Sequence, residues 1–314
     1  MRRNVLSKII KWEGVTMNKH NLSKIRMRET LVSYTFLAPA LIFFCLFVIY
    51  PMVSGVFTSL FDYTLKKFEF VGLQNYINLF QDSIFWKSLM NTLIIVLGSV
   101  PIVVIFALFV SITIYQKKSG VRSFFRAVFY LPVVTGTVAV TVVWKWIYDP
   151  LNGILNYILQ SGGVIDQPIM WLGDKCFAIW AIIIILLTTS VGQPIILYVA
   201  ALGNIPQSFV EAAEVDGGNN WQIFTKIKWP CLMPTTLYVV VITTINSFQC
   251  FSLIQLLTSG GPNYSTSTIM YLVYEKAFKL TQFGYANAMG VMLAIIIGII
   301  SFVQFKVLGN DVEY

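Results

Sequence analysis

Six long apolar stretches follow one another along this chain, without the regular alternation of apolar and charged residues that a water-soluble domain needs. A helix crosses a bilayer with about 20 predominantly apolar residues, because every backbone polar group must be satisfied within the segment. We therefore predict an all-α, polytopic membrane protein with six transmembrane helices. The stretches lie near residues 33–60, 89–115, 126–148, 177–201, 232–257 and 284–308.

The composition supports lipid as the solvent, since 57% of the residues are hydrophobic, 11% are charged and the mean hydropathy is +0.74. The first stretch follows a basic run, as a secretory signal does. It is too long for a signal h-region and lacks a small-residue cleavage site, so we expect a retained helix. Translation from Met17 instead of Met1 is an open alternative, because Met17 is also followed by basic residues.

The net charge of +8 could suggest a nucleic-acid partner, but the positions of the basic residues favour a membrane protein. The N-terminus, the segments 116–126 and 202–230 between apolar stretches, and the C-terminus together contain 15 Lys and Arg residues. The segments on the other side of the membrane contain 7. This asymmetry predicts that both termini are cytoplasmic. We expect a basic cytoplasmic segment at 1–32, a transmembrane domain at 33–308 and a cytoplasmic tail at 309–314.

The residues offer little for catalysis. His20 is the only histidine, the four cysteines are widely spaced, and neither a metal-ligand spacing nor a G-x-S-x-G elbow is present, so we predict no metal site and no catalytic residues. An intramembrane enzyme is disfavoured on that ground. A proton-coupled secondary carrier is disfavoured because no carboxylate pair lies within an apolar stretch. The sequence has no G-x-x-x-x-G-K-[ST], so any ATP hydrolysis belongs to another chain.

The segment 203–230 between the fourth and fifth stretches is polar and predicts two short helices on the cytoplasmic side. Pro206 suits a first helical turn, and Gly217-Gly218 suits a left-handed stop. Asn219 or Asn220 can open the second helix, which Pro230 should end. Small side chains at 212 and 213 allow a close approach by another surface, and acidic residues at 211, 214 and 216 border them; a surface hairpin with solvated charges remains the alternative.

The spacing in this segment is specific. Glu211-Ala212-Ala213, then three residues, Gly217, then nine residues, Ile227 and Pro230 together resemble the EAA loop of binding-protein-dependent ABC transporter permeases. Trp229 stands where that pattern usually has Leu. The residues LIQLLTSGGP at 253–262, Tyr274, Ala277-Phe278 and Gly284-Tyr285-Ala286 resemble the maltose-type, oligosaccharide-importing branch.

This resemblance implies a type I ABC importer permease in a bacterial cell (inner) membrane, which forms half of a pathway for a sugar or oligosaccharide. It implies four kinds of partner: a second homologous permease subunit, two copies of an ABC ATPase, an extracytoplasmic solute-binding protein, and the substrate. ATP and Mg would be bound by the ATPase, so no cofactor is expected in this chain. A non-sugar solute such as a glycerophosphodiester is the alternative substrate. The residues implied in coupling to the ATPase are Glu211, Ala212, Ala213, Asp216 and Gly217.

Polar side chains in the fourth and fifth apolar stretches are candidates for the substrate pathway, because such groups are costly in hydrocarbon unless they face a cavity or a partner. Hydroxyls and amides can also bind the hydroxyls of a sugar. Hydrogen bonding between helices explains such residues equally well. The positions that match the sugar site of the maltose-type permease are Thr189, Ser190, Gln193, Thr243, Asn246 and Ser247.

Overall fold

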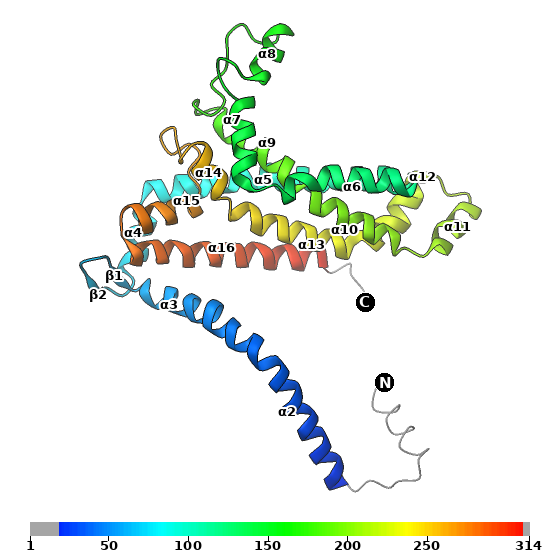
Figure 1. Ribbon diagram of the computed structural model, residues 1–314, viewed down its shortest axis with the longest axis horizontal. Coiled ribbons are helices and arrows are strands. Elements are labelled where there is room, and N and C mark those ends of the chain that lie inside the picture. The colour runs from blue at the N-terminus through cyan, green and yellow to red at the C-terminus, as the bar shows by residue number, and fades with distance from the viewer. Residues whose placement is uncertain (1–18, 310–314) are drawn as a thin grey trace. The chain divides into compact units, whose positions relative to one another are not determined.

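The computed structural model describes residues 19–309 (Figure 1). Most of the expected basic segment at 1–32, including Met17, lies outside the described residues, and so does the expected tail beyond residue 309. Contacts divide the chain into two units, residues 1–57 and residues 58–314. Each unit is described separately below.

The described part of the first unit is helical throughout. Helix α2 (Lys19–Phe44) continues through a π-helical turn, η1 (Cys45–Ile49), into α3 (Tyr50–Thr58). Residues Glu29–Thr58 are long and apolar enough to cross a membrane, and none of the most apolar window is buried. A helix that is apolar all round and uncovered needs lipid or another protein around it.

The second unit contains the other apolar spans. Helices α5 (Ser83–Tyr115) and α16 (Phe283–Gly309) are each long enough alone. A third begins with α12 (Asn220–Ile223), passes through the π-helical turn η2 (Phe224–Lys228) and continues as α13 (Trp229–Phe248) and α14 (Ser252–Leu257). Among the described residues four helices meet the criterion alone, and two bent pairs raise the number to six.

The third and fourth spans are bent rather than straight. Helices α6 (Ser119–Val134) and α7 (Thr137–Ile147) meet at 97°, and α9 (Ala178–Ser190) and α10 (Gly192–Gly203) meet at 41°. The residues explain both bends. Gly136 has an extended backbone between α6 and α7, and Pro194 has no N–H to bond the carbonyl of Ser190 four residues earlier.

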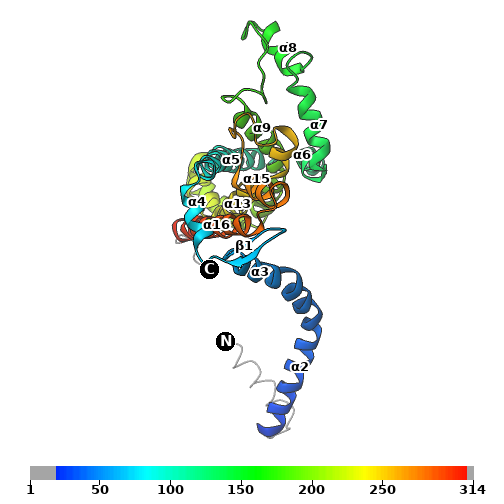
Figure 2. The ribbon, with the colours of Figure 1, turned by 90° about the vertical axis from the view of Figure 1, so that its left-hand side faces the viewer.

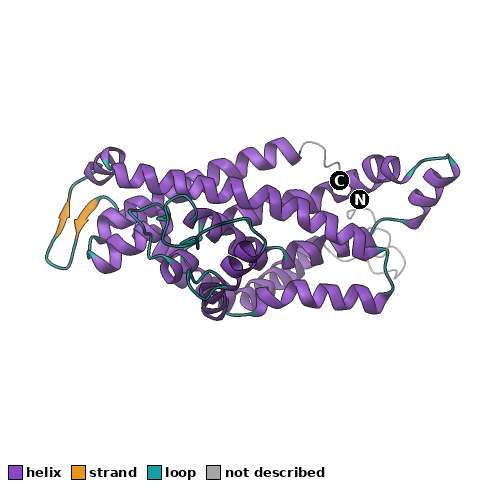
Figure 3. Ribbon diagram, turned by 90° about the horizontal axis from the view of Figure 1, so that it is seen from above, coloured by secondary structure: helices purple, strands orange, loops and turns teal. Residues whose placement is uncertain are grey.

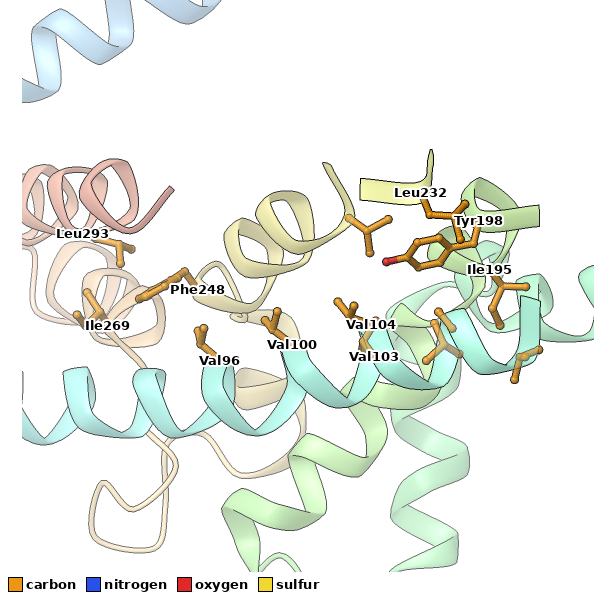
Figure 4. Close-up of a cluster of buried hydrophobic side chains, with 14 of the residues drawn as sticks. Val96, Val100, Val103, Val104, Ile195, Tyr198, Leu232, Phe248, Ile269 and Leu293 are labelled. Atoms are coloured by element: carbon orange, nitrogen blue, oxygen red, sulfur yellow. The ribbon is translucent and has the colours of Figure 1, made fainter. Parts of the chain in front are cut away.

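Helix α5 is the central element of the packed core (Figure 4). Its buried positions recur every three or four residues, so one face of α5 packs chiefly against α10 and α13, with α9 and α15 also in contact. Val96, Val100 and Val103 on this face pack in the same cluster as Tyr198 of α10 and Phe248 of α13. Since lipid tails are as apolar as these side chains, close packing between helices holds such a core more than water exclusion does.

The first turns of α5 also hold a connecting loop by hydrogen bonds. Asn91 Nδ2 donates to the carbonyl oxygens of Tyr264 (2.8 Å) and Ser267 (2.9 Å), and the Ile269 N–H donates to Thr92 Oγ1 at 3.1 Å. These bonds satisfy polar groups of the loop that leads into α15 (Ile269–Tyr274), the turn η3 (Glu275–Lys279) and α16. The polar residues near the start of α5 therefore have a structural role.

Two small elements were not expected from an all-helical pattern. Residues Phe61–Tyr63 (β1) and Phe68–Phe70 (β2) form an antiparallel hairpin in which Asp62 pairs with Glu69, and α4 (Gln74–Gln81) follows it. The rings of Phe61 and Phe68 stack at 4.6 Å, and contacts of this kind stabilise a short strand pair. The first predicted stretch, 33–60, ends just before the hairpin, and the observed helix ends two residues earlier, at Thr58.

The ends of the second unit differ in character. The hairpin, α4 and α15 lie at one end of the bundle, and α11 (Gln207–Val215) and α12 lie at the other (Figures 1 and 3). The end view shows α5, α13, α15 and α16 close together, while α7 and α8 (Ile154–Ser161) project from the bundle (Figure 2). The projecting region has its own polar centre at Asn156, whose side chain bonds Pro150, Ile169 and Trp171.

Candidate functional site

A pocket of about 160 Å³ lies between the fourth and fifth spans. It is lined by hydroxyl and amide side chains together with apolar residues, and no charged side chain is among its lining residues. Five of the six candidates for the substrate pathway line it: Thr189, Ser190, Gln193, Thr243 and Asn246. The fold therefore brings together residues that lie more than 50 positions apart in the sequence.

The bend between α9 and α10 shapes this pocket. Ser190 ends α9, and Gln193 and Pro194 lie in the first turn of α10, so three lining residues surround the break. Gly192 sits between them without a side chain, and a Cβ there would lie 2.5 Å from the carbonyl oxygen of Phe129 on α6. The glycine thus allows α10 to approach α6, and the proline leaves the carbonyl of Ser190 without a helical donor.

A second pocket of about 240 Å³ adjoins the first, since Val133 and Thr189 line both. Apart from Leu186 of α9, its other lining residues come from the α6–α7 region and from the break between α13 and α14, where Gln249, Cys250 and Ser252 lie. The α6–α7 bend, the α9–α10 bend and the α13–α14 break therefore border two neighbouring pockets of mixed polar and apolar lining. Irregular backbone within a membrane bundle is found where it lines a cavity or is covered by protein.

Ser247 is the candidate that the fold separates from the pocket. Its side chain is 2% exposed and its hydroxyl lies 3.0 Å from that of Ser99 on α5, whereas the adjacent Asn246, about 100° away around α13, is exposed and lines the pocket. Helix-to-helix hydrogen bonding, the alternative considered from the sequence, describes Ser247 in this structure. Phe248 is likewise fully buried in the core and does not line the pocket.

Several lining residues were not singled out from the sequence. Tyr238, Ile242, Leu197 and Val133 line the first pocket beside the polar candidates. Tyr238 lies eight residues before Asn246, which is close to the same face of a helix, and that spacing could have identified it. The contribution of Val133 could not have been read from the pattern, because it depends on the 97° bend after α6.

At the other end of the unit, α11 ends as its sequence predicts. Gly217 has φ of +79°, the left-handed conformation that suits glycine. The Gly218 N–H donates to the carbonyl of Ala213 at 2.9 Å, and the Gly217 N–H donates to that of Glu214 at 3.0 Å. These two bonds make a Schellman motif, which ends α11 and turns the chain toward α12.

The side chains around this turn form a projecting, accessible surface. Glu211, Ala212 and Asp216 are exposed, and so is Gly217, while Ala213 is half-buried. Exposure of the apolar Val215 reaches 87%. A hollow of about 360 Å³ lies beside the turn. Its lining residues are Ala213, Asp216, Gly217, Gly218, Gln222, Ile223, Lys226 and Ile227. Small, acidic and apolar groups thus meet on one uncovered surface, to which a partner could bind.

The second helix of this segment differs from the prediction at its end. Asn219 caps it, with a reciprocal pair of bonds to Gln222, as expected for a capping box. The helix does not stop at Pro230, however, but runs on through η2 into α13. The reason is that Pro230 lies in the first turn of α13, where the π-helical turn before it absorbs the missing N–H and proline is tolerated.

No group of three or more His, Cys, Asp or Glu side chains that could hold a metal occurs within residues 19–309. The chemistry that the described residues bring together is therefore hydrogen bonding and apolar contact in the paired pockets, and an exposed acidic surface on α11.

The chain resembles known transport proteins in sequence. Residues 80–313 match the family described as "Binding-protein-dependent transport system inner membrane component". The chain is 34% identical over 292 residues to "Probable ABC transporter permease protein YesP" of Bacillus subtilis, covering 91% of this chain and 93% of the relative. It is 35% identical over 285 residues to "Multiple sugar-binding transport system permease protein MsmF" of Streptococcus mutans, covering 89% and 97%.

The fold resembles that of a solved transporter. One chain of a bacterial ABC transporter involved in the import of the acidic polysaccharide alginate superimposes with a TM-score of 0.80 at 24% identity, covering 93% of this chain and all of that chain. At this identity the likeness concerns the fold.

Proposed function

Because this chain belongs to the family of binding-protein-dependent transport system inner membrane components, we propose that it forms half of the membrane pathway of an ATP-driven importer for a sugar or oligosaccharide. The observation that carries this proposal is the pocket in which Gln193 and Asn246 meet. Both side chains are neutral hydrogen-bonding groups on membrane-spanning helices, and both are exposed in the chain alone.

The chemistry of this pocket suits a neutral polyhydroxyl solute. Amides donate and accept hydrogen bonds, hydroxyls do both, and Tyr238 adds an aromatic ring against which the apolar face of a sugar can pack. A buried positive charge, which a strongly anionic solute would require, is missing from the lining residues of both pockets. A relative is named for lactose transport, and another for multiple sugars, which supports the same substrate class.

The pocket is too small to enclose an oligosaccharide, since small-molecule sites commonly measure about 300–1,000 Å³. Its volume is about 160 Å³, and it opens on the surface of the chain. In the proposed assembly a second, homologous permease subunit completes the pathway. An extracytoplasmic solute-binding protein delivers the sugar at the end where the hairpin and α15 lie.

Coupling is assigned to α11 and the turn that follows it. In this assignment the α11 surface contacts one of two ATPase subunits, which bind ATP and Mg. Glu211 and Asp216 make polar contacts, Ala212 and Ala213 allow a close approach, and Gly217 sets the direction of the turn. Beyond the turn at residues 216–219, the helix from Asn220 to Phe248 is continuous, so movement that passes through this turn would reach Thr243 and Asn246 without a further loop. Both termini would lie on the ATPase side, as the distribution of basic residues predicts.

The experiment is uptake into proteoliposomes that contain this chain, its partner permease and the ATPase, with the solute-binding protein outside and ATP inside. Radiolabelled disaccharides and oligosaccharides, including lactose and maltose, are the substrates. We expect uptake of at least one saccharide that stops when ATP is replaced by a non-hydrolysable analogue or when the binding protein is omitted.

Three results would contradict the proposal. Uptake that continues without ATP hydrolysis would indicate a secondary carrier or a channel. Transport of a glycerophosphodiester with no saccharide uptake would change the substrate class. A chain that transports alone, without a second permease, would contradict the division of the pathway between two subunits.

A further inference from the structure

Helix α4 exposes two different strips of side chains. Leu73, Ile77 and Phe80 recur at helical spacing and are 64%, 49% and 50% exposed. The neighbouring strip is also exposed and consists of amides, Gln74, Asn78 and Gln81. The exposed surface of one short helix is therefore divided lengthwise into an apolar and a polar half, and none of its residues is charged.

The fold holds α4 in this orientation. Asn75 Nδ2 donates to the carbonyl oxygens of Ser59 (2.8 Å) and Phe61 (2.9 Å), and Leu79 is fully buried in the main core. These contacts fix the third face of α4 against the second unit. The apolar strip is consequently held outward by specific bonds, at the cost of leaving three large side chains uncovered in the chain alone.

The apolar strip continues onto a membrane-spanning helix. Asp82 alone separates α4 from α5, and the ring of Phe80 lies 6.3 Å from that of Trp86 in the first turn of α5. The indole Nε1 of Trp86 also donates to the carbonyl oxygen of Phe80 at 2.8 Å. Trp86 and Met90, one turn further along α5, are both exposed. The strip on α4 thus joins the uncovered outer surface of a bilayer-crossing helix.

From this continuity we propose that α4 lies along the bilayer surface, with Leu73, Ile77 and Phe80 among the acyl chains and the amide strip among the headgroups. Helices that lie in the interface show this division into an apolar and a polar face. Trp86 marks the same level, because tryptophan prefers the boundary between headgroups and hydrocarbon. The inference depends on α5 crossing the membrane and is independent of the transported solute.

The role of such a contact is to set the depth of the pathway. Through Asn75 and Leu79, α4 is attached to the hairpin and to the core around α5. A helix held at the bilayer surface would therefore resist movement of this end of α5 along the membrane normal while the other end is moved. The competing occupant of the strip is a protein surface, either the partner permease or a solute-binding protein.

Site-directed spin labelling of the assembled transporter tests the proposal. The exposed cysteines Cys45, Cys176 and Cys231 are replaced by serine, and buried Cys250 is kept. Four variants, each with one introduced cysteine, are then made: I77C, N78C, F80C and Q81C. The results are compared between the adjacent positions 77 and 78, and between 80 and 81. Each chain is assembled with its partners in vesicles of phosphatidylethanolamine and phosphatidylglycerol and carries a nitroxide label. Collision rates with oxygen, which concentrates in lipid, and with a water-soluble nickel chelate are measured.

The expected result is an oxygen-to-nickel ratio severalfold higher at positions 77 and 80 than at 78 and 81. Equal ratios within each pair would overturn the proposal. Labels at 77 and 80 that are immobilised and shielded from both reagents would overturn it in favour of a protein contact. If a label prevents assembly, a membrane-impermeant maleimide is applied to the unlabelled cysteine variants instead. Slow reaction at 77 and 80 with fast reaction at 78 and 81 supports the interfacial position. The reverse order of rates overturns it.

Discussion

The hydroxyls of Ser99 and Ser247 lie 3.0 Å apart in a buried contact between α5 and α13, while the adjacent Asn246 is exposed and lines the pocket. Two adjacent polar residues of one helix thus have different roles. Ser247 joins α13 to α5 in the core, and the exposed Asn246 is available to a solute. This difference allows the pathway and the packing to be tested separately.

The first prediction concerns Asn246 and uses Ser247 as its matched control. Asn246→Ala removes hydrogen-bonding groups from the pocket, so we expect the KM for uptake to rise about tenfold, as for the loss of about 1.4 kcal/mol of binding. Ser247→Ala should instead lower the free energy of unfolding by about 0.6 kcal/mol, which is typical of a bond between membrane helices. Uptake kinetics and thermal unfolding in detergent check both. Similar kinetic effects of the two variants would argue against the pocket.

The second prediction concerns the exposed carboxylate of Glu211. Glu211→Lys should abolish ATP-dependent uptake and lower the amount of ATPase that copurifies with this chain, because a reversed charge is placed at a protein contact. Membrane insertion should be unchanged, since the side chain is exposed. Glu69→Lys, the same reversal on the exposed β2 strand at the other end of the unit, is the control and should retain the ATPase. Equal ATPase recovery for both variants would be evidence against the coupling assignment.

The third prediction concerns the backbone at Gly217. No atom lies within 4 Å of the place where a Cβ would stand, so the φ of +79° is the only obstacle to a side chain there. Gly217→Val should strain the turn by about 1–2 kcal/mol and impair coupling, measured as ATP hydrolysed per sugar transported. Gly217→Asn should be tolerated, since asparagine adopts the left-handed conformation more readily. If the two variants behave alike, the conformation of this turn is not what limits coupling.

The fourth prediction concerns the close approach of α16 to β1. A Cβ on Gly284 would overlap the carbonyl oxygen of Phe61, whereas one on Gly290 of the same helix would meet nothing within 4 Å. Gly284→Ala should therefore destabilise the chain by about 1–3 kcal/mol, as overpacking does. Gly290→Ala should leave the Tm unchanged or raise it slightly, because alanine favours the helix. Thermal unfolding of both purified variants, compared with the unaltered chain, distinguishes them.

The coupling segment could be predicted from local sequence because its structure is local. The stop at Gly217 and the cap at Asn219 depend on residues within one or two turns, and the structure has both. The prediction that the second helix ends at Pro230 was wrong. Whether a proline ends a helix or lies in its first turn depends here on the π-helical turn before it, and the sequence shows no pattern that predicts that turn.

What the sequence determined by itself was the solvent and the class of fold. Long apolar stretches have no stable alternative to membrane helices, since unpaired backbone groups cannot remain in hydrocarbon. Only the tertiary structure decided which side of each helix faces the pathway. Asn246 and Ser247 are neighbours of similar polarity, and their separation arises from the rotation of α13 against α5, together with bends after Val134 and Ser190 that place Val133 and Gln193 beside it. Such rotations are set by packing between distant segments, which hydropathy along the chain does not record.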